Sequence, residues 1–148
     1  MPHINTILHG DVLDKLKEIE TESIQCVVTS PPYWGLRDYG SDGQLGLEET
    51  PELYVENMVN VFREIKRVLR DDGTVWLNLG DTYSATRWSN TPSTTGISRK
   101  VSDIVLQKTT KLPDKNLVGI PWRVAFALQA DGWYLRQDII WHKPNPMP

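Results

Sequence analysis

A short polar segment, Ser30-Pro31-Pro32-Tyr33, follows an apolar run at residues 24–28 and joins residue types that suit one kind of chemistry. Proline lacks a backbone N–H and fixes its own φ angle, so two consecutive prolines end a strand and keep the next turn rigid. The Ser30 hydroxyl and the Pro31 carbonyl are then fixed hydrogen-bond acceptors, with a flat aromatic ring beside them. Such a corner can hold an amino group conjugated to an aromatic ring while that ring stacks on Tyr33.

The chemical benefit of these acceptors is the geometry that they impose on the nitrogen. The lone pair of an exocyclic amino group on a nucleobase is delocalised into the ring, so the nitrogen is a weak nucleophile. Acceptors on its N–H groups draw the nitrogen toward tetrahedral geometry and localise the lone pair. A base must leave its helical stack to reach such a corner. The alternative interpretation is structural: a strand end with a Pro-Pro turn packed by aromatic rings.

The segments around this corner predict alternating strands and helices. Short apolar runs predict strands at residues 4–9, 24–29, 74–79 and 133–142, with 24–29 buried on both faces. Helical spacing and capping residues predict helices at residues 12–20 after Asp11, 51–69 after Thr50, and 121–130. Residues 35–49, rich in glycine, and residues 82–116 are predicted to be loops, the first of them mobile. The alternation is typical of a doubly wound parallel sheet.

Three of the predicted strands end in polar turns, and ligands of open α/β sheets bind beyond the carboxyl ends of the strands. These turns are Gly10-Asp11, the Ser30–Tyr33 corner and Gly80-Asp81. A Gly-Asp pair is also a common turn, so the first and third turns are weak signals on their own. The four-residue corner is the stronger signal because its parts have complementary tasks.

Length, charge and cysteine content narrow the class of protein. A chain of 148 residues with 39% hydrophobic residues can form one globular domain with a core. No apolar run is long enough to span a bilayer, and the N-terminus does not resemble a signal peptide, so we expect no membrane partner and a cytoplasmic location. The single cysteine, Cys26, lies in an apolar run and is predicted to be a buried thiol rather than a nucleophile.

The two halves of the chain differ in charge. Residues 1–83 hold 15 acidic and 7 basic residues, whereas residues 84–148 hold 4 acidic and 9 basic residues. The second half is therefore the one that suits a polyanion, although ordinary solvated faces explain the same numbers.

The order of motifs resembles that of the amino-group DNA methyltransferases, which transfer a methyl group from S-adenosylmethionine to cytosine N4 or adenine N6. "TSPPYW" is similar to their catalytic motif, and "LHGD" to the motif that opens the circularly permuted beta class. The segments "DDGTVWLNLGD", "LVGIPWRVAFAL" and "GWYLRQDIIWHKPNPMP" resemble the strand, the helix and the base-contacting segment that follow. The resemblance covers essentially the whole chain. It implies a Rossmann-like, doubly wound α/β fold with a mostly parallel sheet of the S-adenosylmethionine-dependent methyltransferase type.

The resemblance also implies roles for individual residues, and it implies no metal ion. The catalytic pocket for the target amino group would consist of Ser30, Pro31, Pro32 and Tyr33. Gly10 and Asp11 would lie near the adenosine part of S-adenosylmethionine. Contacts with DNA would come from Trp34, Arg37, Arg87, Arg99, Lys100, His142 and Lys143, with Lys108 and Lys111 as further phosphate contacts chosen by charge. For His142, a partly buried histidine at a strand end is the alternative interpretation.

Serine at the first position of the catalytic motif favours cytosine N4 in this family, with adenine N6 as the alternative. Cytosine C5 methylation needs a thiolate nucleophile in a Pro-Cys setting, which Cys26 lacks. The implied mechanism is a direct in-line transfer of methyl from the sulfonium to nitrogen, without a covalent enzyme intermediate.

The sequence departs from the family in one respect. Beta-class enzymes carry a target-recognition region and a glycine-rich Phe-x-Gly-x-Gly motif beyond the segments present here, and neither occurs in these 148 residues. The glycines Gly40, Gly43 and Gly46 neither follow a predicted strand nor open a helix, so they are no substitute. We therefore expect residues 1–148 to be a partial catalytic domain with an incomplete sheet, its C-terminal strands missing.

The resemblance implies double-stranded DNA with a flipped target base as a partner. The missing segments add a second expected partner, either a complementary C-terminal fragment or a second copy joined through exposed strand edges. We expect the chain to be inactive alone. A catalytically inactive module that binds DNA or a partner is an alternative of a different class, and a generic nucleotide-binding domain is a weaker one that leaves "SPPYW" unexplained.

Overall fold

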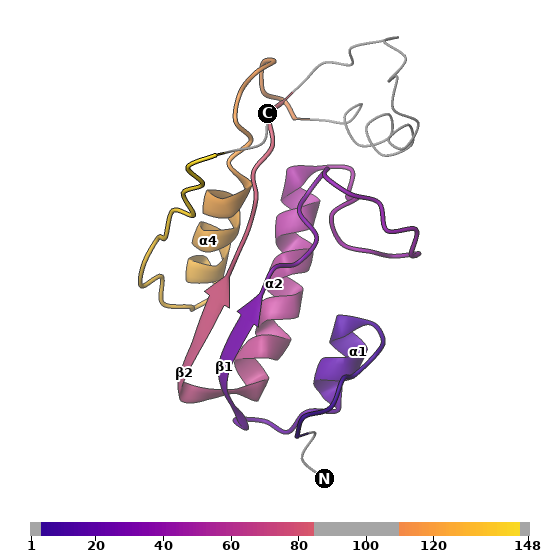
Figure 1. Ribbon diagram of the computed structural model, residues 1–148, viewed down its shortest axis with the longest axis vertical. Helices are drawn as coiled ribbons and strands as arrows, with labels where there is room; N and C mark the ends of the chain where they lie inside the picture. The colour runs from indigo at the N-terminus through magenta and orange to yellow at the C-terminus, as the bar shows by residue number, and fades with distance from the viewer. Residues whose placement is uncertain (1–3, 85–109, 146–148) are drawn as a thin grey trace.

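A computed structural model describes residues 4–84 and 110–145 of the chain, in which helices flank a short sheet (Figure 1). The elements in chain order are α1 (Val12–Lys17), β1 (Ile24–Thr29), α2 (Pro51–Val68), β2 (Leu69–Leu77) and α4 (Ile120–Ala130). No helix in these two ranges is both long and apolar enough to cross a membrane.

The sheet pairs β1 with β2 in parallel, so both strands end at the same edge. Cys26 is opposite Thr74, and Thr29 is opposite Leu77. The ladder continues one residue further, since the Asn78 N–H donates to the Thr29 carbonyl at 2.9 Å. The residues that follow the two strands are thereby held side by side, so two of the three predicted polar turns lie at one edge of the sheet, whereas the third, Gly10-Asp11, follows no strand.

The start of β2 differs from the prediction. The sequence predicted a helix to residue 69 and a strand from Thr74, but α2 ends at Val68 and β2 begins at Leu69. Ile24 is opposite Leu69 while Cys26 is opposite Thr74, so the extra residues of β2 form an irregularity in the register. Residues 70–73, which lie between the predicted helix and the predicted strand, are therefore part of β2.

Helix α2 forms the centre of the core. The Thr50 hydroxyl caps it by accepting from the Leu53 N–H at 3.1 Å, and Pro51 occupies the first turn, as predicted. The buried side chains recur at helical spacing: Pro51, Tyr54, Met58, Val61, Phe62, Ile65 and Val68. All of them except Pro51 and Val68 form one core cluster with Val118, Ile120, Val124 and Leu128 in and before α4. Helix α2 contacts both α1 and α4, and it runs alongside the strands (Figure 1).

The opposite face of the sheet is open in the described residues. Val28 is 78% exposed and Trp76 is 53% exposed, so the prediction that residues 24–29 are buried on both faces is wrong. The prediction of a buried Cys26 is wrong for the same reason, because this side chain is exposed. An apolar run is buried on both faces only where a second layer covers the sheet, and the described residues supply only one layer.

Two predicted strands do not form. Residues 4–9 and 133–142 have no strand assignment, and most of their apolar side chains face solvent, with Ile7 94% and Ile140 77% exposed, while Trp133 packs against the core. An apolar run becomes a strand only when a neighbouring strand accepts its hydrogen bonds, and no such neighbour exists for either run in the described part of the chain. Helix α1 is also shorter than predicted and ends at Lys17 rather than at residue 20.

An ion pair fastens the end of α4 to α2 and makes stability depend on pH. Arg63 donates to Asp131 through Nε and Nη2, the latter at 2.6 Å from Oδ1. The hydrogen bond from Arg63 lowers the pKa of the Asp131 carboxyl. The stabilisation is therefore complete above the ordinary carboxyl pKa of about 3.9 and is lost as pH falls through the lowered pKa.

Replacing Arg63 by glutamine is expected to remove this contribution. Urea unfolding of the variant between pH 6 and pH 2 should show a smaller loss of stability on acidification than the original chain shows. Lys17→Gln, which breaks an exposed pair within α1, is the control and should leave the pH dependence unchanged. An acid transition identical in the Arg63 variant would contradict the assignment.

Candidate active site

The corner formed by Ser30, Pro31, Pro32 and Tyr33 leaves the sheet at the carboxyl end of β1. Ser30 is exposed, while the two prolines and Tyr33 are half-buried. The hydroxyl thus lies at the surface of the molecule and not inside the packed core. Because Thr29 is opposite Leu77, the residues after β2 lie directly beside this corner.

Helix α2 supports the corner from within the core. The Tyr54 hydroxyl donates to the Pro32 carbonyl at 2.9 Å, and the Tyr54 side chain is fully buried. Burial raises the pKa of this hydroxyl, so it stays a neutral donor at ordinary pH. The bond holds the carbonyl of the peptide between Pro32 and Tyr33, so it helps to fix the orientation of this peptide.

The indole of Trp34 is part of the core rather than of the surface. It is 5% exposed, and its Nε1–H donates to the Glu48 carbonyl at 3.0 Å. The predicted contact of Trp34 with DNA has no support from this position, because both its ring and its only donor are already engaged. Its observed task is to attach the segment after the corner to the chain before α2.

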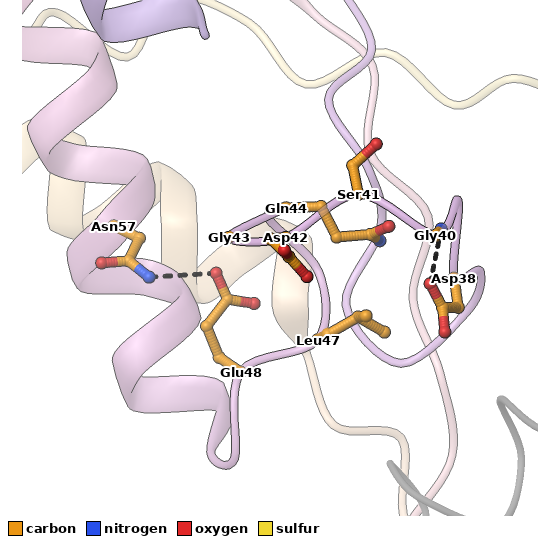
Figure 2. Close-up of a pocket in the computed structure, with 9 residues that line it drawn as sticks. All are labelled: Asp38, Gly40, Ser41, Asp42, Gly43, Gln44, Leu47, Glu48 and Asn57. Atoms are coloured by element: carbon orange, nitrogen blue, oxygen red, sulfur yellow. Dashed lines mark hydrogen bonds between the residues drawn. The ribbon is translucent and has the colours of Figure 1, made fainter.

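Residues 35–49 fold back onto the corner instead of extending away from it. The Gly35 N–H donates to the Gly46 carbonyl at 2.8 Å, and the Gly46 N–H donates to the Glu48 carboxylate at 2.8 Å. Figure 2 shows the same carboxylate accepting from Asn57 of α2, at 3.0 Å, beside an open pocket of about 560 Å³. Gly46 has φ of +95°, and a Cβ there would come within 2.9 Å of the Tyr33 carbonyl oxygen.

The acid of each Gly-Asp turn caps a helix. Asp11 Oδ1 accepts from the Leu13 and Asp14 N–H groups at the start of α1, as predicted. Asp81 reaches across the fold and accepts from the N–H groups of Thr82, Gly119 and Ile120. Asp81 therefore joins the end of β2 to the start of α4, a role that no local pattern indicated.

The two residues predicted to contact S-adenosylmethionine lie at this first cap. Gly10 has φ of +148°, a backbone conformation in which a residue with a side chain would be strained. Asp11 is exposed and remains accessible. Their contact with the methyl donor stays a prediction.

The other residues predicted to contact DNA fall into two groups. Arg37, Lys111, His142 and Lys143 are exposed, as a contact with DNA requires. The interpretation of His142 as a partly buried residue at a strand end is wrong, because its segment forms no strand. Arg87, Arg99, Lys100 and Lys108 lie outside the described residues. For all of them the contact with DNA stays a prediction.

Loss of the Tyr54 hydroxyl is expected to loosen the corner. Tyr54→Phe leaves the half-buried Pro32 carbonyl without its donor, which should cost about 1–2 kcal/mol of unfolding free energy in urea denaturation. Tyr39→Phe, at a tyrosine that is 60% exposed, is the control and should be neutral. An unchanged stability in Tyr54→Phe would mean that the hydrogen bond does not hold the turn.

The elements define an α/β protein with a rigid corner at the carboxyl ends of two parallel strands. The chain belongs to the N6/N4 DNA methylase family, whose match covers residues 24–148. DNA methyltransferases of this family use S-adenosylmethionine as the methyl donor. No solved structure matches the chain.

Individual relatives are Type II methyltransferases. The chain is 52% identical over 145 residues to M.XycI of Xanthomonas campestris pv. cyanopsidis, an alignment that covers 97% of this chain and 48% of the relative. It is 51% identical over 145 residues to M.Cfr9I of Citrobacter freundii, covering 97% of this chain and 48% of that relative. It is 48% identical over 146 residues to M.SmaI of Serratia marcescens, covering 96% and 49%. The chain thus spans about half the length of these curated relatives.

Proposed function

We propose that the chain is part of a site-specific DNA methyltransferase that transfers a methyl group from S-adenosylmethionine to an exocyclic amino group, with cytosine N4 as the target. The observation that carries the proposal is the exposed Ser30 hydroxyl on a rigid corner where two paired parallel strands end. Membership of the DNA methylase family supports DNA as the substrate. Serine at the first position of the motif favours cytosine N4 over adenine N6, which is the alternative.

In this proposal the corner activates the target nitrogen. The Ser30 hydroxyl and the Pro31 carbonyl accept hydrogen bonds from the amino group and localise its lone pair toward the incoming methyl carbon. Tyr33 stacks on the extruded base, and Tyr54 keeps the Pro32 peptide in place through its 2.9 Å hydrogen bond. The methylated nitrogen then loses a proton to solvent. No side chain of the corner becomes covalently attached to the base.

The chain's own residues fit the methyl donor in part. When bound, S-adenosylmethionine supplies an electrophilic methyl group on a sulfonium. The exposed Asp11 carboxylate is an acceptor of the kind that ribose hydroxyls need, so we assign it to the adenosine part. A glycine-rich segment for the methionine part is not found in the sequence, and we assign that part to a complementary polypeptide segment.

A complementary partner is proposed because the chain matches only about half of each relative. Within residues 4–84 and 110–145, β1 and β2 pair only with each other, and Val28 and Trp76 face solvent. Further strands would pair with the free edges and cover this apolar face. In their absence a second copy of the chain would occupy the same edges.

A reconstitution assay tests the proposal. The 148-residue chain is incubated with labelled S-adenosylmethionine and mixed-sequence double-stranded DNA, alone and together with the segment of the Xanthomonas relative that this chain does not match. We call this mixture the reconstituted pair. We expect methyl incorporation by the pair and none by either part alone, with N4-methylcytosine in the hydrolysed product.

Each other result has a distinct meaning. Robust incorporation by the chain alone would overturn its proposed inactivity. N6-methyladenine in the product would replace cytosine by adenine as the target. DNA binding without incorporation, by a pair that forms a stable complex, would favour a binding module instead of an enzyme.

A further inference from the structure

The ring of Tyr33 is held by Asn78 and Gly80, which follow β2 within three residues. Asn78 Nδ2 lies 3.0 Å from the Tyr33 hydroxyl oxygen and donates to it. A Cβ on Gly80 would come within 2.7 Å of Tyr33 Cδ2 and 2.9 Å of Cε2, so the ring rests directly on the bare backbone of this glycine. The side chain of Asn78 and the absence of a side chain at Gly80 thus determine where the ring lies.

The backbone at Asn78 is itself fixed. Its N–H donates to the Thr29 carbonyl at 2.9 Å, which extends the ladder between the strands by one residue. Asn78 therefore bonds to both sides of the corner, through its main chain to the residue before Ser30 and through its side chain to Tyr33. A change in the first side-chain torsion would move the hydroxyl away from Asn78, while a rotation of the ring about its own axis would change its contact with the backbone at Gly80.

Resting on the proposed function, we propose that Asn78 is a positioning residue for methyl transfer. Its hydrogen bond to the Tyr33 hydroxyl fixes the direction in which the ring extends, and Gly80 beneath the ring fixes its tilt, so that together they set the plane on which the target base stacks. Asn78 acts on the reaction only through Tyr33.

The plane of Tyr33 matters because the acceptors of the corner do not move with it. Ser30 and Pro31 belong to the rigid part of the turn, whereas the tyrosine ring can rotate about two side-chain torsions. A base stacked on a misplaced ring would present its amino group off the line of the two acceptors, and small misplacements are costly in oriented reactions. Loss of the hydrogen bond should lower kcat about tenfold, equivalent to about 1.4 kcal/mol.

A double-mutant cycle in the reconstituted pair tests this inference. Asn78→Leu keeps the size of the side chain without the hydrogen bond, and Tyr33→Phe removes the hydroxyl. We expect each to lower kcat about tenfold and the double variant to lower it no further, because both remove the same interaction. Asn78→Asp should retain most of kcat, since the Tyr33 hydroxyl can donate to the new carboxylate. Asn60→Leu, at an exposed position of α2, is the control and should leave kcat unchanged.

A second measurement needs neither DNA nor methyl donor. The ring resonances of Tyr33 in the 148-residue chain, assigned through their loss in Tyr33→Phe, should shift in Asn78→Leu and stay in place in Asn60→Leu. Additive losses of kcat, or unmoved Tyr33 resonances in Asn78→Leu, would overturn the inference while the activity of the unsubstituted pair upholds the proposed function. No incorporation by the unsubstituted pair would overturn the proposed function and, with it, this role of Asn78.

Discussion

Replacing Ser30 by alanine is expected to lower kcat of the reconstituted pair by about 100-fold, the typical loss when one fixed polar partner of a reacting group is removed. The hydroxyl is the acceptor that we assign to the target amino group, and alanine offers none. Because Ser30 is exposed, its hydroxyl contributes little to folding, so urea denaturation should give a free energy of unfolding within about 0.5 kcal/mol of the original. The combination of lost rate and retained stability is what distinguishes a catalytic hydroxyl from a structural one.

Two further variants sharpen this test. Ser41→Ala removes an exposed hydroxyl from the pocket beside the corner and should leave kcat unchanged. Ser30→Asp restores an acceptor at the same place, and we expect it to recover part of the rate lost in Ser30→Ala. Full activity in Ser30→Ala would contradict the proposed mechanism, and an equal loss in Ser41→Ala would show that the effect is not specific to the corner.

The elements defined by local signals were predictable from the sequence, and the elements defined by distant partners were not. Helix α2 begins at Pro51 because a threonine cap and an N1 proline act within a few residues of each other. The run at residues 133–142 carries an equally clear apolar pattern yet forms no strand. A strand depends on a neighbour that the pattern itself cannot specify, whereas a helix satisfies its own hydrogen bonds.

The same distinction applies to the site. The Ser30–Tyr33 corner was recognisable because its four residues are consecutive and chemically unusual. Its supports were not, since Tyr54 lies 22 positions from Pro32 and Asn78 lies 45 positions from Tyr33. Nothing local to a buried tyrosine in an amphipathic helix distinguishes a donor to the site from an ordinary core residue. Trp34 is the opposite case, a residue next to the motif whose role was not predictable from that place. Its position suggested a contact with DNA, but its ring is only 5% exposed.

Asp81 joins the strand end that carries the site to helix α4. It follows β2 by a few residues, so it belongs to the same strand end as Asn78 and Gly80, and its carboxylate accepts from the N–H groups that begin α4. Helix α4 packs against α2, which carries Tyr54 beneath the corner. The position of the corner therefore depends on an interaction that lies outside it.

Asp81→Ala is expected to be the most destabilising of the substitutions considered, at roughly 3 kcal/mol of unfolding free energy. The estimate combines the loss of a helix cap with the loss of charge-assisted hydrogen bonds to the N–H groups of Thr82, Gly119 and Ile120. Gly119 has φ of +80° and offers no side-chain cap of its own, so no group in the helix replaces the carboxylate. Urea denaturation followed by far-ultraviolet circular dichroism measures the change.

The matched variants separate the cap from the charge. Asp71→Ala removes an exposed carboxylate from the irregular start of β2 and should change stability by less than about 0.5 kcal/mol. Asp81→Asn keeps one acceptor oxygen without the charge, so its loss should lie between those of the original chain and Asp81→Ala. If Asp81→Ala and Asp71→Ala were equally mild, the carboxylate would not fasten α4 to the strand end. The corner would then owe its position to the packing of α2 alone, and Tyr54→Phe would become the larger perturbation.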